Sequence, residues 1–341
     1  MFDAVGKMPS TGNPISLLRQ NYDQVDFGVR RFRLRPGPAR QRLESAARAF
    51  VDGVNAVVDL TDVDAVTDRV EQLEPQWRGF AYEGAGMGCA VLDLMTFSRG
   101  RRCAALLERV GTAYPHVVHI GVGWAHARLR LRPWWGIPVG DPLLRWLGWD
   151  GFGFHQGFFH SDAVIGRHRV ERGLAPEQRA IRDQGLGRAL WFHECADPDG
   201  ITPRIEHFPQ HRRADLWSGV GLAATYAGGA DGGELGRLTV LAGRHTAAVA
   251  QGSAFACAAR RACGIVPEHV EQAAAALTGA SASEAAAWTD RARDALGDGP
   301  HGAAHYEKWR AEIRRLWSDH HRAGHGEPFG NISLDQEETS R

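Results

Sequence analysis

The sequence has few cysteines, and their spacing gives them no common role. Five are present, with no Cys-x-x-Cys pair among them: Cys89, Cys103, Cys195, Cys257 and Cys263. An odd, scattered set of this kind is typical of reduced thiols packed as small apolar side chains. The pattern therefore predicts neither a disulfide framework nor a cysteine zinc site.

An excess of one charge and long apolar runs are lacking as well. Lys plus Arg and Asp plus Glu both number 40, so the formal net charge is zero, which argues against a nucleic-acid partner. No run approaches the roughly 18 apolar residues of a membrane span. Residues 1–20 show no basic segment followed by an apolar one, the pattern of a secretory signal. We expect a cytoplasmic protein with no membrane span and no nucleic-acid partner.

Familiar catalytic and cofactor motifs are also missing. The phrase Gly219-Val220-Gly221-Leu222-Ala223-Ala224 matches a dinucleotide fingerprint only superficially, because no apolar strand precedes it. No phosphate-binding loop, nucleophile elbow or metalloprotease motif is present. His155 and His160 lie five apart, so on a helix they diverge too far to share a metal. No metal site is predicted, and the sequence does not identify a cofactor.

Glycine is abundant, and six glycines recur at a nearly constant interval. In most copies a polar or aromatic residue precedes a Gly-x-Gly phrase, as in Gln184-Gly185-Leu186-Gly187. The repeated positions are Gly84, Gly121, Gly157, Gly185, Gly219 and Gly252, separated by 37, 36, 28, 34 and 33 residues. A period in the mid-thirties is typical of helix-pair repeats, in which each pair buries its apolar face on the next.

Each repeat is expected to contain a short helix, a turn and a longer helix that carries the glycine. Glycine inside a helix costs about 0.5–1 kcal/mol relative to alanine, so its recurrence predicts a neighbouring helix that passes too close for a side chain. We predict an all-α, α-solenoid-like array with a period of about 34 residues, and an irregular α bundle is the alternative. The expected order is an irregular arm over 1–40, one repeat domain over 41–318 ending in a capping helix, and a polar tail over 319–341.

The repeat register places polar residues at matching positions just before the glycines. Two residues before the glycine stand Tyr82, His119, His155, Asp183, Trp217 and Ala250, and one residue before it stand Glu83, Ile120, Gln156, Gln184, Ser218 and Gln251. Equivalent positions in a stacked array form ladders along one surface, so Glu83, His155 and Asp183 are predicted to share a groove. We take these three as acid/base candidates, with Arg188 as their electrostatic partner. The alternative is that they cap helices or hydrogen-bond between repeats.

Aromatic residues are concentrated in the middle of the chain. Seven of the eleven tryptophans fall between 124 and 217, including Trp134 and Trp135 in a segment, 131–149, that interrupts the repeat. This density predicts an apolar cavity for a long, flat, unsaturated ligand, with an aromatic-rich core as the alternative. The predicted substrate-binding residues are Tyr82, Trp124, Phe158, Trp191, Asp215, Trp217 and Tyr226.

Four phrases of the sequence are distinctive: Gly79–Gly84, Asp150–Phe159, Gln184–Phe192 and Arg213–Ala223. They resemble an actinobacterial family of unknown function encoded beside enediyne polyketide synthases, and the resemblance spans roughly residues 40–315. It implies a pathway, the maturation of a polyketide-derived polyene into an enediyne core, and it carries over no catalytic residue.

Two functions from different classes follow. The chain either binds an apolar polyene or polyyne intermediate in an aromatic groove and assists its modification, or it is a non-catalytic helical-repeat scaffold that carries the intermediate or docks other biosynthetic enzymes.

Overall fold

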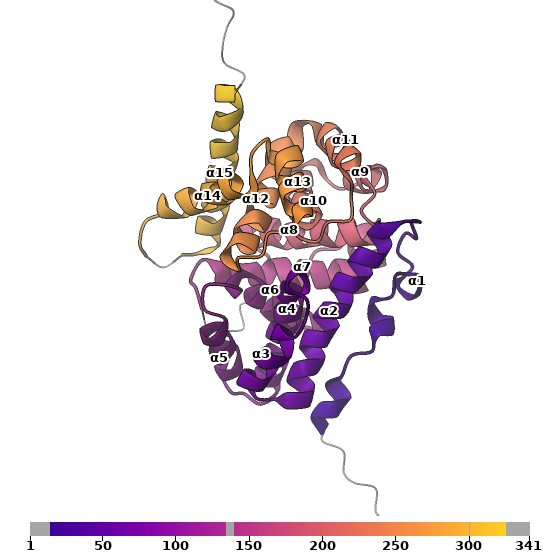
Figure 1. Ribbon diagram of the computed structural model, residues 1–341, viewed down its shortest axis with the longest axis vertical. Helices are drawn as coiled ribbons and strands as arrows, with labels where there is room; N and C mark the ends of the chain where they lie inside the picture. The colour runs from indigo at the N-terminus through magenta and orange to yellow at the C-terminus, as the bar shows by residue number, and fades with distance from the viewer. Residues whose placement is uncertain (1–13, 134–139, 300, 325–341) are drawn as a thin grey trace, which may run out of the picture.

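The computed structural model describes residues 14–133, 140–299 and 301–324, and every regular element within these ranges is helical (Figure 1). The α-helices are α1 (Phe27–Arg30), α2 (Pro38–Leu60), α3 (Val63–Glu71), α4 (Pro75–Met95), α5 (Arg101–Val110), α6 (Pro115–Arg128), α7 (Leu147–Phe159), α8 (Pro176–His193), α9 (Pro198–Glu206), α10 (Gln210–Tyr226), α11 (Gly232–Ala242), α12 (Thr246–Ala262), α13 (Glu268–Thr278), α14 (Ala282–Asp294) and α15 (Ala303–Gly324). Short turns of helix are η1 (Pro14–Leu18), η2 (Tyr22–Val25), η3 (Leu144–Trp146), η4 (Asp162–Gly166) and η5 (Gly243–His245). The predicted all-α class is confirmed.

The longer helices form one continuous inner row. Each packs on the next in the order α2, α4, α6, α7, α8, α10, α12 and α14. Shorter helices form an outer layer, with α3 and α5 over the first half and α9, α11 and α13 over the second (Figure 1). The predicted unit, a short helix followed by a longer one that carries the glycine, is therefore found. The units of α7 and α8 differ, because only η3 and η4 stand where the short helix was expected.

Glycines bring neighbouring inner helices into backbone contact. A Cβ on Gly185 would clash with the carbonyl oxygen of Asp150 in α7, and one on Gly187 with that of Leu216 in α10. The first glycine of each Gly-x-Gly phrase thus faces the preceding helix and the second faces the following one. The same alternation holds for Gly84 and Gly86, Gly121 and Gly123, and Gly219 and Gly221. The close approach that the glycine repeat predicted is confirmed.

The register predicted for the third glycine is wrong. In α7 the backbone contacts are made by Gly151, against Ile120, and Gly153, against Arg182. Gly157 lies further along and faces side chains of α8, where its Cβ would meet that of Ala189. With Gly151 in register, the residues before the glycine become Trp149 and Asp150, and His155 leaves the row.

The inner row curls until its beginning touches its later helices. The Phe80 ring of α4 packs edge-on against the Tyr226 ring of α10, with centroids 5.1 Å apart. Arg260 of α12 donates to the carbonyl of Gln76, 3.0 Å away, and Arg42 of α2 donates to that of Ala227 at 2.8 Å. The concave face of the array is therefore enclosed, and the open groove expected of a solenoid is replaced by an interior.

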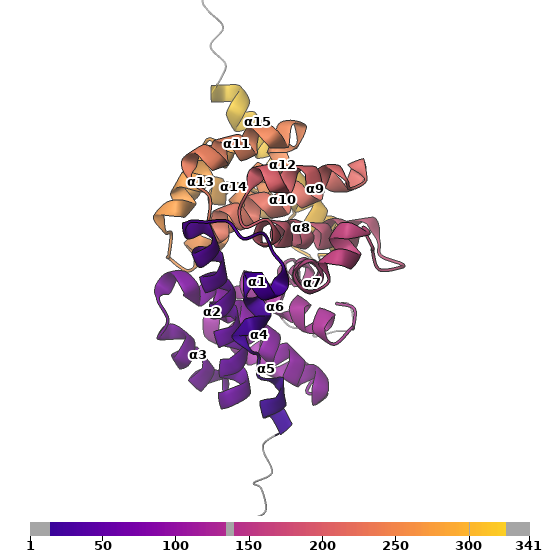
Figure 2. The same cartoon turned by 90° about the vertical axis from the view of Figure 1, so that its right-hand side faces the viewer.

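The arm that precedes α2 lies along the outside of this enclosure (Figure 2). Its side chains Val25, Phe27 and Phe32 are buried, and the Arg33 amide donates to the His193 carbonyl at the end of α8. Helix α2 begins at Pro38, within the expected arm. At the other end α15 packs on α12, α14 and α8, as a capping helix would, and runs to Gly324, into the expected tail. The rest of that tail lies outside the described residues.

Candidate functional site

A ladder of buried polar side chains crosses the interior at the position just before the repeated glycine. Gln184 of α8 donates to Asp150 Oδ2 of α7 at 2.8 Å. The Ser218 hydroxyl of α10 lies 3.2 Å from Gln184 Oε1 and 3.0 Å from Gln251 Oε1 of α12, and can donate its proton to either. All four side chains are fully buried. The predicted ladder therefore exists, and Asp150 occupies its third place.

Arg188 joins this ladder to Glu83. It lies one helical turn after Gln184, and its guanidinium bonds Asp150 Oδ1 and lies 3.4 Å from Glu83 Oε2. Trp124 of α6 donates its indole N–H to Glu83 Oε1 at 2.9 Å. The result is a buried cluster of one cation and two carboxylates, assembled from α4, α6, α7 and α8.

The pKa of Glu83 is raised in this cluster. Burial raises the pKa of Glu83, Arg188 lowers it by a smaller amount, and the neighbouring Asp150 raises it further. Burial opposes the charge of Arg188, but Asp150 and Glu83 outweigh burial and raise its pKa above the usual value. One guanidinium cannot neutralise two carboxylates, and its closer partner is Asp150. Glu83 is thus the carboxyl group best able to hold or exchange a proton.

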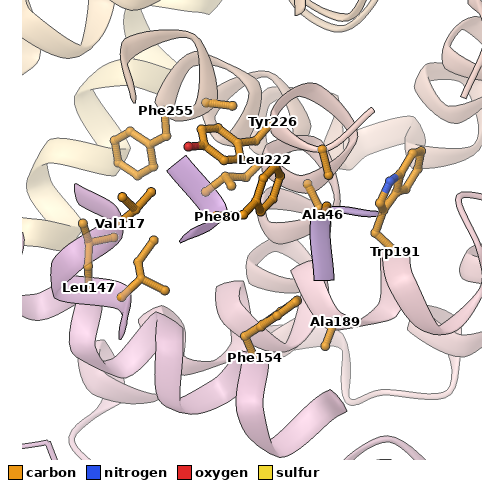
Figure 3. Packing of buried hydrophobic residues seen from close by; sticks show 14 of the residues in the cluster. Ala46, Phe80, Val117, Leu147, Phe154, Ala189, Trp191, Leu222, Tyr226 and Phe255 are labelled. Carbon is orange, nitrogen blue, oxygen red and sulfur yellow. The ribbon is translucent and has the colours of Figure 1, made fainter. Parts of the chain in front are cut away.

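Glu83 and Arg188 stand between two apolar cavities and line both. We call the first the inner cavity. Its lining is mostly apolar and includes Val117, Leu147, Leu222, Tyr226 and Phe255. The second, the middle cavity, is lined by residues that include Ala46, Phe80, Phe154 and Phe158. Figure 3 shows the two sets of side chains following one another through the interior.

A third cavity continues the series toward the arm. This arm-side cavity shares Val25, Phe50 and Trp124 with the middle cavity. It is lined by His155 and Arg128 as well as by Gln20 and Gln24 of the arm. Three narrow, mostly apolar cavities therefore lie in a row, with the carboxyl group of Glu83 near the centre.

Six of the predicted site residues line this row of cavities: Glu83, Arg188, Trp124, Phe158, Tyr226 and His155. His155 is separated from the Glu83 cluster by the indole of Trp124, whose centroid is 5.5 Å from the imidazole. Burial lowers the pKa of His155 to about 3, so the ring is neutral near pH 7.

Asp183 does not share a groove with Glu83 or His155, contrary to the prediction. Its carboxylate forms an ion pair with Arg212 of α10, which donates hydrogen bonds from Nε at 2.6 Å and from Nη2 at 2.7 Å. Arg182 donates to the same group at 3.0 Å. The position two residues before the glycine faces away from the cavities, so Asp183 makes a buried structural ion pair between α8 and α10, the alternative left open by the sequence.

Four predicted substrate-binding residues lie outside the linings of the three cavities. Tyr82 donates to Glu71 at 2.7 Å, and Trp191 donates to the Gly228 carbonyl at 2.9 Å. Asp215 pairs with Arg310 at 3.0 Å, and Trp217 is buried in the core. For these residues the contacts are those of core packing. Trp134 and Trp135 lie outside the described residues.

Sequence reasoning missed several residues of the site. Asp150 would have been found by aligning Gly151-x-Gly153 with the other copies, which also makes the spacing of the repeats more even. His116, Phe80 and Tyr306 line the cavities only because distant helices close the interior. No local pattern marks them.

Neither a metal-ligand cluster nor a membrane-spanning helix is found in the described ranges. No group of three or more His, Cys, Asp or Glu side chains there is arranged to hold a metal ion. Within the same ranges, no helix combines the length and apolarity needed to cross a bilayer.

Fold and site together define a class: an all-α protein whose glycine-packed helical array closes around a row of apolar cavities. The chain belongs to the family described as "Protein of unknown function (DUF1702)", which matches residues 15–317. No curated protein and no solved structure matches it. The expectation of a domain-of-unknown-function family is thus met.

Proposed function

We propose that this protein binds a linear, apolar, unsaturated chain in its row of cavities. The observation that supports this is the sharing of lining residues: Glu83 and Arg188 belong to two cavities, and Phe50 and Trp124 belong to two. A row of narrow, mostly apolar cavities that share lining residues suits an extended chain better than a compact ligand. Aromatic walls such as Phe80, Phe154 and Phe158 offer flat contact surfaces to conjugated double bonds.

The resemblance to proteins of enediyne gene clusters suggests which ligand this would be. The ligand is then a polyene or polyyne intermediate on the way to an enediyne core, held in the cytoplasm where polyketide synthases work. Binding in the interior would shield a reactive, poorly soluble chain from water and from other copies of itself.

Glu83 gives the site a means of acting on the chain. A buried carboxyl group with a raised pKa can donate or accept a proton beside the middle of a bound polyene, and Arg188 would stabilise the carboxylate that forms. The competing proposal is a non-catalytic carrier. It is supported by the complete pairing of Glu83 with Arg188 and Trp124, which is also the pattern of a structural cluster.

Binding is tested by titrating the protein with a conjugated linear tetraene fatty acid, whose fluorescence rises in apolar surroundings. Ala259 is half-buried in the lining of the inner cavity, and Ala262 is exposed on the same helix. We expect Ala259→Phe to reduce the number of bound probes or their affinity about ten-fold, corresponding to about 1.4 kcal/mol. Ala262→Phe is the matched control and should bind as the wild type does. Equal binding by both variants would remove the proposal.

Catalysis and carriage are separated by Glu83→Gln, which keeps the shape of the side chain. The variant gene is returned to a producing strain from which the gene has been deleted. If Glu83 transfers a proton, product is lost while tetraene binding persists. If Glu83→Gln restores full product and Ala259→Phe does not, the protein acts as a non-catalytic carrier.

A further inference from the structure

The arm-side cavity differs from the other two in its charge. Arg128 lies on the last turn of α6 and lines it, and Arg30 and His160 stand close enough to His155 to lower its pKa by charge repulsion. Within the described ranges, neither Arg128 nor Arg30 forms an ion pair with a carboxylate. Arg30 instead donates to the carbonyls of Phe158 and Phe159, both at 3.3 Å. None of the side chains that line this cavity is acidic, so this end of the row carries positive charge.

His155 is a polar group without a polar partner at the same end. Its side chain is 3% exposed, and neither ring nitrogen has a hydrogen-bond partner among the described residues. Its ring lies against Phe159, with centroids 4.9 Å apart, and against Trp124. A buried imidazole in apolar surroundings destabilises the folded protein unless it gains a hydrogen bond. A bound ligand in the arm-side cavity would supply one.

We propose that the arm-side cavity is a head-group site, in which His155 and Arg128 bind the carboxylate of the linear ligand. This rests on the proposed function and narrows the ligand to an apolar chain with one anionic end. The chain then extends from the arm past Trp124 and Glu83 toward the inner cavity. His155 donates one N–H to a carboxylate oxygen, and Arg128 supplies the opposite charge at the rim.

The arm forms the outer wall of this site. Gln20 and Gln24 line it, and the Gln20 amide and carbonyl pair with the Asn55 side chain at 2.8 and 3.1 Å. The half-buried Gln20 and Gln24 add amide groups to the lining, and the Gln20 side-chain amide donates to the Leu18 carbonyl. The site is thus built from α6, α7 and the arm.

The test compares the tetraene fatty acid with its methyl ester, using fluorescence titration and thermal unfolding. We expect the wild type to bind the acid about ten-fold more tightly than the ester, as one charge-assisted contact warrants. Arg128→Gln and His155→Phe should each abolish this preference, because each removes a group that binds the carboxylate and so weakens the acid more than the ester. Arg101→Gln, which removes an exposed arginine of α5, is the charge-matched control and should keep the preference.

The stability of His155→Phe provides the second readout. Because phenylalanine keeps the ring and removes the unpartnered nitrogens, we expect the unliganded variant to unfold at a higher temperature than the wild type while it loses preference for the acid. The head-group site is overturned if the wild type binds acid and ester equally, or if His155→Phe unfolds at a lower temperature and keeps the acid preference. If neither probe binds, the proposed function falls and the head-group site with it. Ester binding without acid preference removes the head-group site alone.

Discussion

Glu83 and Arg188, separated by 105 positions in the chain, meet in the interior and line the same two cavities. Arg188 is shared, because its other partner is Asp150 of the polar ladder. Two carboxylates lie beside one guanidinium in the interior. Burial raises the pKa of Glu83, and the neighbouring Asp150 adds to the rise, while Arg188 opposes it. The fold thus places a proton-carrying group in an otherwise apolar passage.

Removal of the positive charge of Arg188 should destabilise the folded protein. Arg188→Met leaves Asp150 and Glu83 buried without their counter-charge, so we expect a loss of about 3–5 kcal/mol in the free energy of unfolding. Urea denaturation measures the loss. Adding Glu83→Gln and Asp150→Asn to the Met variant should restore a large part of the stability, since it removes the stranded charges. A loss below about 1 kcal/mol in the single variant would show that the cluster is hydrated.

The glycine contacts predict opposite results for one substitution at two places. Gly185→Ala should destabilise by about 3 kcal/mol or more, because its Cβ would overlap the Asp150 carbonyl of a rigid neighbouring helix. Gly236 lies on the exposed side of α11 with nothing within 4 Å of a Cβ. Gly236→Ala should therefore raise stability by about 0.5–1 kcal/mol. The denaturation midpoints of both variants, compared with that of the wild type, test this difference. Similar effects at the two sites would contradict the packing described.

The glycine repeat revealed much of the fold from the sequence because the packing of each inner helix depends on local residues. Gly-x-Gly is visible along the chain, and so is the polar residue before it, such as Gln184 or Ser218. The error at Gly157 arose because α7 carries a further glycine that faces side chains. It displaced Asp150 from the ladder and put His155 in its place.

The enclosure could not be predicted from the repeat. It depends on contacts such as Phe80 with Tyr226 and Arg260 with the Gln76 carbonyl, which join helices far apart in the chain. The curvature of the array is the sum of many small inter-helix rotations, and no single motif encodes it. The sequence predicted an open groove, whereas the structure has a row of internal cavities. Of the predicted site residues, those that face inward, such as Trp124 and Phe158, line these cavities.

Three neutral histidines, the buried His155 and the half-buried His116 and His269, should make the protein sensitive to acid. Burial lowers the pKa of His116 to about 4 and the pKa values of His155 and His269 to about 3, from 6.5. Between pH 6.5 and about 3 the unfolded chain binds protons at these rings and the folded protein does not. Stability is therefore fully present above pH 6.5 and is lost as the pH falls through this window.

Each such histidine contributes about 1.4 kcal/mol for every pH unit of the window. His155→Phe should flatten the fall in stability by up to this amount, measured as the urea midpoint at a series of pH values. Replacement of His207, an exposed residue, by Phe is the control and should leave the slope as it is. An unchanged slope in His155→Phe would mean that the imidazole is already charged in the folded protein.

The central claim, an extended unsaturated chain held inside the array, is tested most directly by identifying what the protein retains when it is purified from a producing strain. Mass spectrometry together with absorption spectra of the denatured protein should reveal a linear polyene or polyyne, about one per chain. The ligand should be present in wild type and Ala262→Phe and depleted in Ala259→Phe. A protein that carries no such molecule, or carries it equally in Ala259→Phe, would contradict the account.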